Sequence, residues 1–393
     1  MRRHNQTLVL MVSPVIVFGL VWVMQAVAHL TLPMNLTAPD ILTWGIVIAG
    51  FISLIGGSIA FKVTSQIIKQ VSYVEISKTK KINSVSLPLI YISILCSILS
   101  AVYLYATIEV NEIGFLHGIK VNLLEEAVAG NKLTTYFVYL FIYQILLTIY
   151  YFNCNGFERN KKTAIIFTAG IFGALMSGSR GLLVFYLIAL IPCIISKKHE
   201  INFNGKLLRK FTLIVIFFFF LYPFIFQGMS VENSDSWLNL FDYISTYLFS
   251  GIAAFNSYVQ HGLPHYDCIL TVPRPLINAL DILWQTNLVV SCPKIYDDIL
   301  LPLPTNVYSI FFAPYHDFGL LGVFLYLFVI GFLSQMSFAK GCLQDNNTWR
   351  FLYCILFYSL TFSFFEDQFA RGIIYYIFGF AAVASNRIVM GKY

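Results

Sequence analysis

The feature that most constrains this chain is a series of ten apolar runs. A run of about 20 apolar residues is long enough to cross the hydrocarbon core of a bilayer as a helix. The runs lie at residues 8–28, 42–61, 87–108, 134–152, 163–177, 182–195, 211–228, 318–338, 351–365 and 372–386. This pattern predicts an all-α polytopic membrane protein with about ten transmembrane helices.

The composition agrees with this interpretation. Only 11% of the 393 residues are charged and 58% are hydrophobic, whereas about 25% of residues are charged in a soluble domain. The net charge of +6 does not indicate a nucleic-acid partner, because most of the basic residues lie in short loops between apolar runs. We therefore expect membrane lipid as the surrounding solvent and no nucleic acid.

The basic residues also orient the chain. With a cytoplasmic N-terminus, 19 of the 25 Lys and Arg residues fall on the cytoplasmic side and 6 on the outer side. Cytoplasmic loops are enriched in Lys and Arg, so both termini are predicted to lie in the cytoplasm. The first run is about 21 residues long, longer than the roughly 7–15 residues of a cleaved signal. We expect it to be retained as the first helix.

A long outer segment divides the chain into three parts. Residues 1–228 hold predicted helices 1–7, residues 229–317 form a large outer loop, and residues 318–393 hold helices 8–10. Two apolar-amphipathic runs in the loop, 243–259 and 276–290, are predicted to be helices that lie on the membrane or cap the bundle. Cys268 and Cys292 share this loop, where an oxidising compartment would permit a disulfide. No Cys or His spacing is typical of a metal site.

Four of the predicted spans are short. Spans 163–177 and 182–195 flank the sequence SGSRG, and spans 351–365 and 372–386 flank Glu366 to Arg371. A fifteen-residue helix rises about 22 Å, less than the hydrocarbon thickness of about 30 Å. We therefore expect both connecting turns to dip below the outer surface, as at many transporter binding sites. The alternative is that the helices are longer and the turns lie at the surface.

Three arginines are predicted on the outer side, at Arg180, Arg274 and Arg371. Guanidinium groups bind phosphate oxygens bidentately and stay charged at any physiological pH. Convergence of the three would form a pyrophosphate site that needs no metal. For Arg180 the alternative is an interfacial side chain that reaches the lipid headgroups. For Arg371 the alternative is a salt bridge with Glu366 or Asp367.

The end of the large loop carries the other candidate residues. The sequences LPTNVYSIF and YHDFGLLG lead into the eighth predicted span. Asp317 stands where the N-cap of that helix would be, and capping is one interpretation. A carboxylate or imidazole at the edge of a cavity is also suited to general-base catalysis. His316, Asp317 and Glu366 are therefore the candidate catalytic residues.

Taken together, three segments resemble the O-antigen polymerases, which are Wzy-type oligosaccharide repeat-unit polymerases. They are SGSRG between two spans, YLFSGIAAFNSY in the large loop, and LPTNVYSIF with YHDFGLLG at the next helix. The order and spacing of these segments extend the resemblance over nearly the whole chain. It implies a GT-C-like glycosyltransferase architecture in the bacterial inner membrane, with the active site facing the periplasm.

The resemblance also implies a reaction and its partners. Both the donor and the acceptor would be undecaprenyl-pyrophosphate-linked oligosaccharides, with no cofactor and with a separate chain-length regulator protein. Arg180 and Asp317 lie in the segments that resemble the family's motifs. Arg274, Arg371, Glu366 and His316 are assigned from their placement, and Asn306, Tyr308 and Tyr315 are the expected substrate-binding residues, the two tyrosines by stacking on sugars.

Two other functions remain open at this point. An O-antigen ligase would share the architecture and the outer arginines, although the NVYSIF and DFG sequences favour a polymerase. A polysaccharide flippase or transporter would not be an enzyme. It is expected to show internal repeats and charged residues deep in several helices, and we find neither in the sequence.

Overall fold

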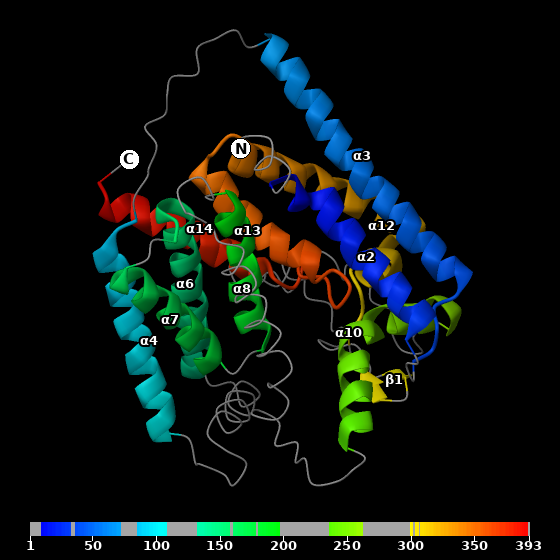
Figure 1. The fold of residues 1–393 in the computed structure, drawn as a ribbon, viewed down its shortest axis with the longest axis horizontal. Helices are drawn as coiled ribbons and strands as arrows, with labels where there is room; N and C mark the ends of the chain where they lie inside the picture. The colour runs from blue at the N-terminus through cyan, green and yellow to red at the C-terminus, as the bar shows by residue number, and fades with distance from the viewer. Residues whose placement is uncertain are drawn as a thin grey trace. The chain divides into compact units, whose positions relative to one another are not determined.

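The computed structural model describes residues 9–32, 36–71, 85–107, 132–157, 160–177, 180–196, 236–261, 299–301, 303–305 and 307–391. These residues are predominantly helical (Figure 1). The α-helices are α2 (Pro14–Thr31), α3 (Ile41–Val71), α4 (Leu87–Thr107), α6 (Lys132–Asn155), α7 (Lys161–Met176), α8 (Arg180–Ser196), α10 (Ser236–His261), α12 (Phe312–Phe338), α13 (Asn347–Thr361) and α14 (Ile373–Val389). A π-helix, η1 (Ala339–Leu343), follows α12 directly.

Nine of the ten predicted spans coincide with helices of the described residues, and the tenth, 211–228, lies outside them. Five described segments are long and apolar enough to cross a membrane. They are Pro14–Thr31, Ile41–Ile67, Leu87–Leu104, Tyr136–Asn155 and Phe312–Leu343. Gly181–Ser196 and Ile373–Val389 are shorter apolar helices. A helical membrane protein is thus confirmed, whereas the number of ten spans stays a prediction.

The large-loop segment contains more regular structure than the sequence indicated. The predicted helix at 243–259 is confirmed as part of α10. Two short strands, β1 (Ile299–Leu301) and β2 (Leu303–Thr305), form an antiparallel pair that was not predicted. The second predicted helix, at 276–290, and the cysteines Cys268 and Cys292 lie outside the described residues.

Helix α12 begins earlier than predicted and is bent. It starts at Phe312 rather than at residue 318, and its N-cap is Phe311. Phe318 (φ −140°, ψ 16°) and Gly319 (φ 61°, ψ −148°) interrupt the helical conformation. Asp317 directly precedes this interruption, and the helical segment that continues to Phe338 begins after it. The interpretation of Asp317 as the N-cap of that segment therefore stays a prediction.

The chain divides into two compact units. Unit 1 comprises Met1–Ser77, Ser234–Ala339 and Leu356–Ile374, and unit 2 comprises Lys78–Asn233, Lys340–Ile355 and Tyr375–Tyr393. Unit 1 contains α2, α3, α10 and α12, together with the turn at 362–372 that links α13 to α14.

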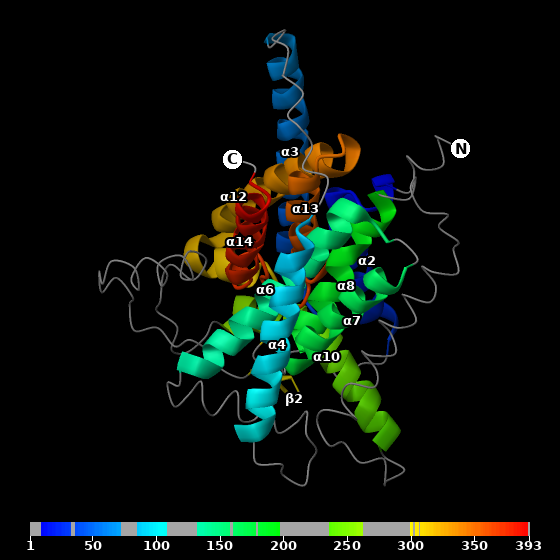
Figure 2. The same ribbon diagram turned by 90° about the vertical axis from the view of Figure 1, so that its left-hand side faces the viewer.

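The main helix pair of unit 1 is α3 against α12, which run side by side (Figures 1 and 2). A Cβ atom added at Gly57 would overlap the backbone carbonyl of Phe328, and one added at Gly331 would overlap that of Leu54. The Ser58 hydroxyl lies 3.3 Å from the Gly331 carbonyl oxygen, to which it donates a hydrogen bond. Small residues of this kind let helices associate closely in lipid, where apolar burial supplies no driving force.

The distribution of polar and apolar side chains fits a lipid environment. Large apolar side chains of α2, α3 and α12 face outward, with Met24 68% and Leu321 64% exposed. Polar side chains such as Ser53, Ser58 and Ser334 are buried between the helices instead. Such exposed apolar surface would be unfavourable in water, so these helices are suited to contact lipid chains.

Unit 2 is built around α6, which packs against α4, α7 and α8 (Figure 2). The buried side chain of Gln144 in α6 donates to the carbonyl oxygen of Ala169 in α7 over 2.7 Å. Gly173 makes room for it, because a Cβ there would collide with the Gln144 amide. The C-terminal helix α14 joins this unit through Asn386, which accepts a 2.8 Å hydrogen bond from the backbone of Ser86.

We expect Gly57→Leu to destabilise the protein and Gly45→Leu to have little effect. Gly57 faces the α12 backbone, whereas nothing lies within 4 Å of a Cβ at Gly45 in the same helix. Overpacking costs about 1–3 kcal/mol even where side chains can adjust, and a backbone carbonyl cannot. Thermal denaturation of the purified protein in detergent measures the difference. Equal melting temperatures for the two variants would contradict the assigned α3–α12 contact.

Candidate active site

Two groups of polar side chains in unit 1 are candidates for a functional site. One lies at the start of α12, and the other lies in the 362–372 turn. Both contain residues that the sequence singled out.

His316 and Asp317 form a buried pair directly before the bend in α12. Nδ1 of His316 lies 3.1 Å from Oδ1 of Asp317. The side chains are 6% and 0% exposed, respectively. Because water is largely excluded, the attraction between imidazole and carboxylate is stronger than at an exposed site. In the tautomer with a proton on Nδ1, the carboxylate holds the ring and directs Nε2 away from itself.

Aromatic side chains from α10 and α12 surround this pair. The ring centroid of Tyr258 lies 4.9 Å from that of Phe312, 6.3 Å from Tyr315 and 5.8 Å from His316. Burial raises the pKa of Tyr258, and the charges of Tyr315 and Asp317 raise it further. The Tyr258 hydroxyl therefore stays protonated at neutral pH and is able to donate a hydrogen bond. We call Tyr258, Phe312, Tyr315, His316 and Asp317 the α12 cluster.

Tyr308 packs against Phe312 of the α12 cluster. It is 2% exposed, and its ring centroid is 4.3 Å from that of Phe312. A sugar ring needs an accessible aromatic face, which Tyr258 and Tyr315 are better placed to offer because they are only half-buried. The predicted sugar contact of Tyr308 therefore stays a prediction that would require the site to open.

The 362–372 turn contains an ion pair between Glu366 and Arg371. Oε1 of Glu366 pairs with the guanidinium group of Arg371, and Oε2 accepts a 2.9 Å hydrogen bond from Gln368. Both carboxylate oxygens of Glu366 are thus engaged. Of the two salt-bridge partners considered for Arg371, Glu366 is therefore the one that the structure shows. A role for Glu366 as a base would have to compete with these two contacts.

Asp367 is the most buried acid of the turn. Its Oδ2 accepts a 2.7 Å hydrogen bond from the hydroxyl of Tyr326 in α12. Its Oδ1 accepts from the backbone amides of Phe369 and Ala370, at 3.0 and 3.3 Å. Burial raises the pKa of Asp367 to about 6, against the opposite effect of these three hydrogen bonds. The carboxyl group therefore changes charge close to neutral pH.

Backbone hydrogen bonds connect the turn to the segments that resemble the polymerase motifs. The amide of Ile310 donates to the carbonyl oxygen of Ser363 over 2.9 Å, and the amide of Ser309 donates to that of Gly251 over 3.2 Å. The indole of Trp22 in α2 donates to the Ser363 hydroxyl over 3.1 Å. Four sequence segments far apart in the chain thus hold one another in place within unit 1.

The structure brings some of the predicted site residues together and leaves others undescribed. Tyr315, His316 and Asp317 belong to one cluster, and Glu366 pairs with Arg371. Arg180 is the first residue of α8 in unit 2, and its side chain lies outside the described part of the structure. Arg274 and Asn306 also lie outside it. The convergence of the three arginines therefore stays a prediction.

Sequence reasoning missed three residues of these sites. Tyr258 lies in the recognised segment YLFSGIAAFNSY but was not singled out, because many aromatic residues fill this chain. Asp367 was considered only as a partner of Arg371, and Tyr326 gave no signal among the apolar residues of its span. The contact between Tyr326 and Asp367 joins residues 41 positions apart, which no local pattern reveals.

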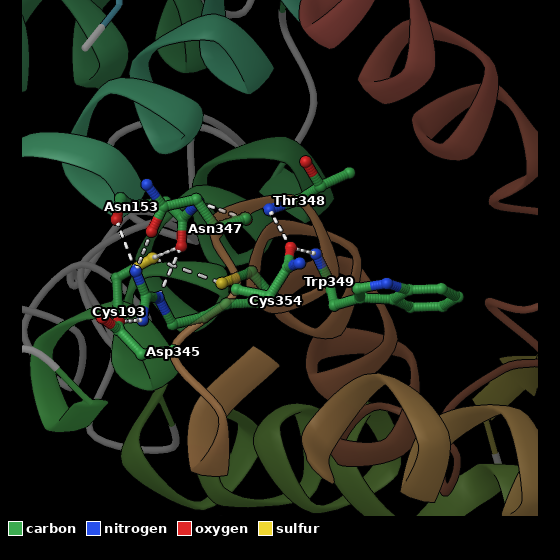
Figure 3. A network of polar contacts seen from close by, with 9 residues as sticks. Asn153, Cys193, Asp345, Asn347, Thr348, Trp349 and Cys354 are labelled. Carbon is green, nitrogen blue, oxygen red and sulfur yellow. Dashed lines mark hydrogen bonds and ion pairs between the residues drawn. The ribbon is translucent and has the colours of Figure 1, made fainter. Parts of the chain in front are cut away.

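A third polar cluster, in unit 2, includes Asn153, Asp345 and Asn347 (Figure 3). These residues contact the side chain of Arg350, which is buried. Its guanidinium group donates to the side chain of Asn153 over 2.8 Å and to the Asn153 carbonyl over 3.0 Å. It also donates to Asp345 over 2.6 Å and to the side chain of Asn347. The hydrogen bond to Asp345 raises the pKa of Arg350, although burial alone would lower it. These contacts make Arg350 a structural link between α6 and α13.

Groups of three or more His, Cys, Asp or Glu side chains that could hold a metal ion are absent from the described residues. Comparisons with protein-family models, with curated proteins and with solved structures give no match to this chain.

We expect Arg350→Met to lower stability, because it removes the guanidinium group that donates to two buried oxygens of Asn153, the side-chain Oδ1 and the backbone carbonyl. An unsatisfied buried polar group costs about 1–3 kcal/mol. Arg387→Met is the matched control, since Arg387 is an exposed arginine of the same unit. Thermal denaturation in detergent compares the two variants. An unchanged melting temperature for Arg350→Met would show that the network contributes nothing.

Proposed function

We propose that this chain is an O-antigen polymerase of the bacterial inner membrane. It joins undecaprenyl-pyrophosphate-linked oligosaccharide repeat units at the periplasmic face during lipopolysaccharide biosynthesis. The observation that carries the proposal is the buried pair His316–Asp317 beside Tyr258. Two of the sequence segments that resemble the polymerases supply these three residues. The backbone hydrogen bond from Ser309, before α12, to Gly251 of α10 supports the assignment.

In the proposed reaction, the growing chain leaves its lipid pyrophosphate and is transferred to a hydroxyl of the incoming unit. The acceptor hydroxyl loses its proton as its oxygen attacks the anomeric carbon. His316 is the proposed proton acceptor, through Nε2, and Asp317 holds the ring through Nδ1. A carboxylate that orients a histidine and stabilises its protonated form is a recurrent arrangement in acyl-transfer enzymes.

The leaving group sets the second requirement. The bond from the anomeric carbon to pyrophosphate breaks as negative charge develops on the phosphate oxygens. Positive charges that are already in place stabilise this negative charge, because no group has to reorient during the reaction. Arg180, Arg274 and Arg371 are the proposed source of the positive charge. Half-buried Tyr258 and Tyr315 are suited to stack on sugar faces of the acceptor.

Gene deletion tests the proposal directly. We expect a deletion strain to carry lipopolysaccharide with a single repeat unit, and Arg180→Ala to reproduce this phenotype at normal protein level. Arg180→Lys should also fail if bidentate binding is required, because lysine supplies only a point charge. Electrophoresis of lipopolysaccharide reads the chain length. A persistent long ladder would exclude a polymerase, and complete loss of O-antigen would indicate a flippase.

The proposed orientation has its own test. We expect alkaline phosphatase inserted after His261, at the end of α10, to be active because that site is periplasmic. A fluorescent protein fused to the C-terminus should fold and fluoresce in the cytoplasm. This expectation follows from the distribution of Lys and Arg residues. The reverse pattern of activities would place the candidate site on the wrong side of the membrane.

A further inference from the structure

The 362–372 turn is built to hold one arginine in a fixed position. Two backbone hydrogen bonds define the turn. The amide of Arg371 donates to the Asp367 carbonyl oxygen over 3.0 Å, and the amide of Gly372 donates to the Gln368 carbonyl oxygen over 3.1 Å. At the start of this short helical turn, the Asp367 side chain accepts the amides of Phe369 and Ala370. This is the arrangement of an N-cap, which stabilises the turn that follows it.

Further contacts fix both ends of the turn. The Tyr326 hydroxyl holds Asp367 from α12, and the Ser359 hydroxyl donates to the Gln368 carbonyl from α13 over 3.4 Å. At the other end, Glu366 contacts the Arg371 guanidinium and is itself held by Gln368. The Arg371 side chain nevertheless remains 38% exposed, so it combines a fixed backbone with access from outside.

We propose that Asp367 is a positioning residue for Arg371, and that binding of a pyrophosphate group at Arg371 requires the ionised Asp367 carboxylate. This inference rests on the pyrophosphate role given to Arg371 in the proposed function. The carboxylate does not touch the ligand. It acts by accepting two backbone amides and the Tyr326 hydroxyl, and these bonds are stronger when the acceptor is charged.

The direction of the pH dependence follows from the surroundings of Asp367. The titratable groups that face it among the described residues are the Tyr326 phenol from α12 and Glu366 and Arg371 of its own turn. Helices α2 and α13 contact other residues of the turn: Trp22 donates to Ser363, and Ser359 donates to Gln368. Neither Trp22 nor Ser359 titrates. Burial raises the pKa of Asp367 to about 6. Protonation below that pH weakens the cap, so binding is strongest above about 6 and declines as the pH falls.

The experiment measures binding of inorganic pyrophosphate to the purified full-length protein in detergent, at pH values from 5 to 7.5. Because pyrophosphate also titrates in this range, each variant is compared with wild type at the same pH. Asp367→Asn keeps the shape of the side chain but cannot ionise, so it lacks the charged acceptor at every pH. We expect it to bind pyrophosphate about fivefold more weakly than wild type at pH 7.5, as for a weakened cap. It should also lose the additional decline that wild type shows between pH 7.5 and pH 5.

Two further variants separate positioning from simple structural support. Tyr326→Phe removes a hydrogen bond that lowers the pKa of Asp367, so the pH midpoint of binding should move upward. Asp40→Asn is the matched control, because Asp40 caps α3 through the amide of Thr43 at 2.8 Å. Hydrogen bonds from the Thr43 amide and from Gln260 lower the pKa of Asp40. Its carboxylate therefore stays charged from pH 5 to 7.5, and this variant should keep the wild-type profile.

The outcomes distinguish this inference from the proposal on which it rests. If Arg371→Ala binds pyrophosphate as well as wild type, or if wild type does not bind it, the anion-binding role of Arg371 fails and the inference fails with it. If Arg371→Ala loses binding but Asp367→Asn keeps the full pH dependence of wild type, only the inference is overturned. An unchanged midpoint for Tyr326→Phe would also count against it.

Discussion

The close backbone contact between α3 and α12 is the interaction on which the described part of unit 1 most depends. At Gly57 and Gly331 the two helices approach until no side chain fits between them. In lipid, such contact surfaces must supply the association energy that apolar burial supplies in water. Helix α12 carries His316 and Asp317 at its start and Tyr326 farther along. Its position against α3 therefore fixes the α12 cluster and the support for Asp367 together.

The three acids of these sites have different kinds of partner. Asp317 has a histidine partner, Glu366 has an arginine partner, and Asp367 accepts hydrogen bonds from a phenol and two amides. An opposite charge favours the ionised form, whereas burial with neutral donors opposes it. Burial raises the pKa of Asp367 to about 6, so its protonation state depends on the pH of its compartment.

Much of the helical architecture could be predicted from apolar runs, because lipid demands long apolar helices with few charges. Nine of the ten predicted spans lie on helices, and α10 was predicted inside the large loop. The bend in α12 was not predicted, because one glycine within an apolar run is usual in membrane helices. The site was predicted in part. Local motifs identified His316 and Asp317, but Tyr326 and Arg350 acquire their partners through contacts between distant segments.

The bend at Gly319 restricts which residues can occupy this position. Its dihedral angles, φ 61° and ψ −148°, are the mirror image of an extended conformation that L-residues adopt readily. Space for a Cβ is available, since nothing lies within 4 Å of it. Position 319 is therefore restricted by handedness rather than by volume: an L-alanine would have space for its side chain but would be strained by these dihedral angles.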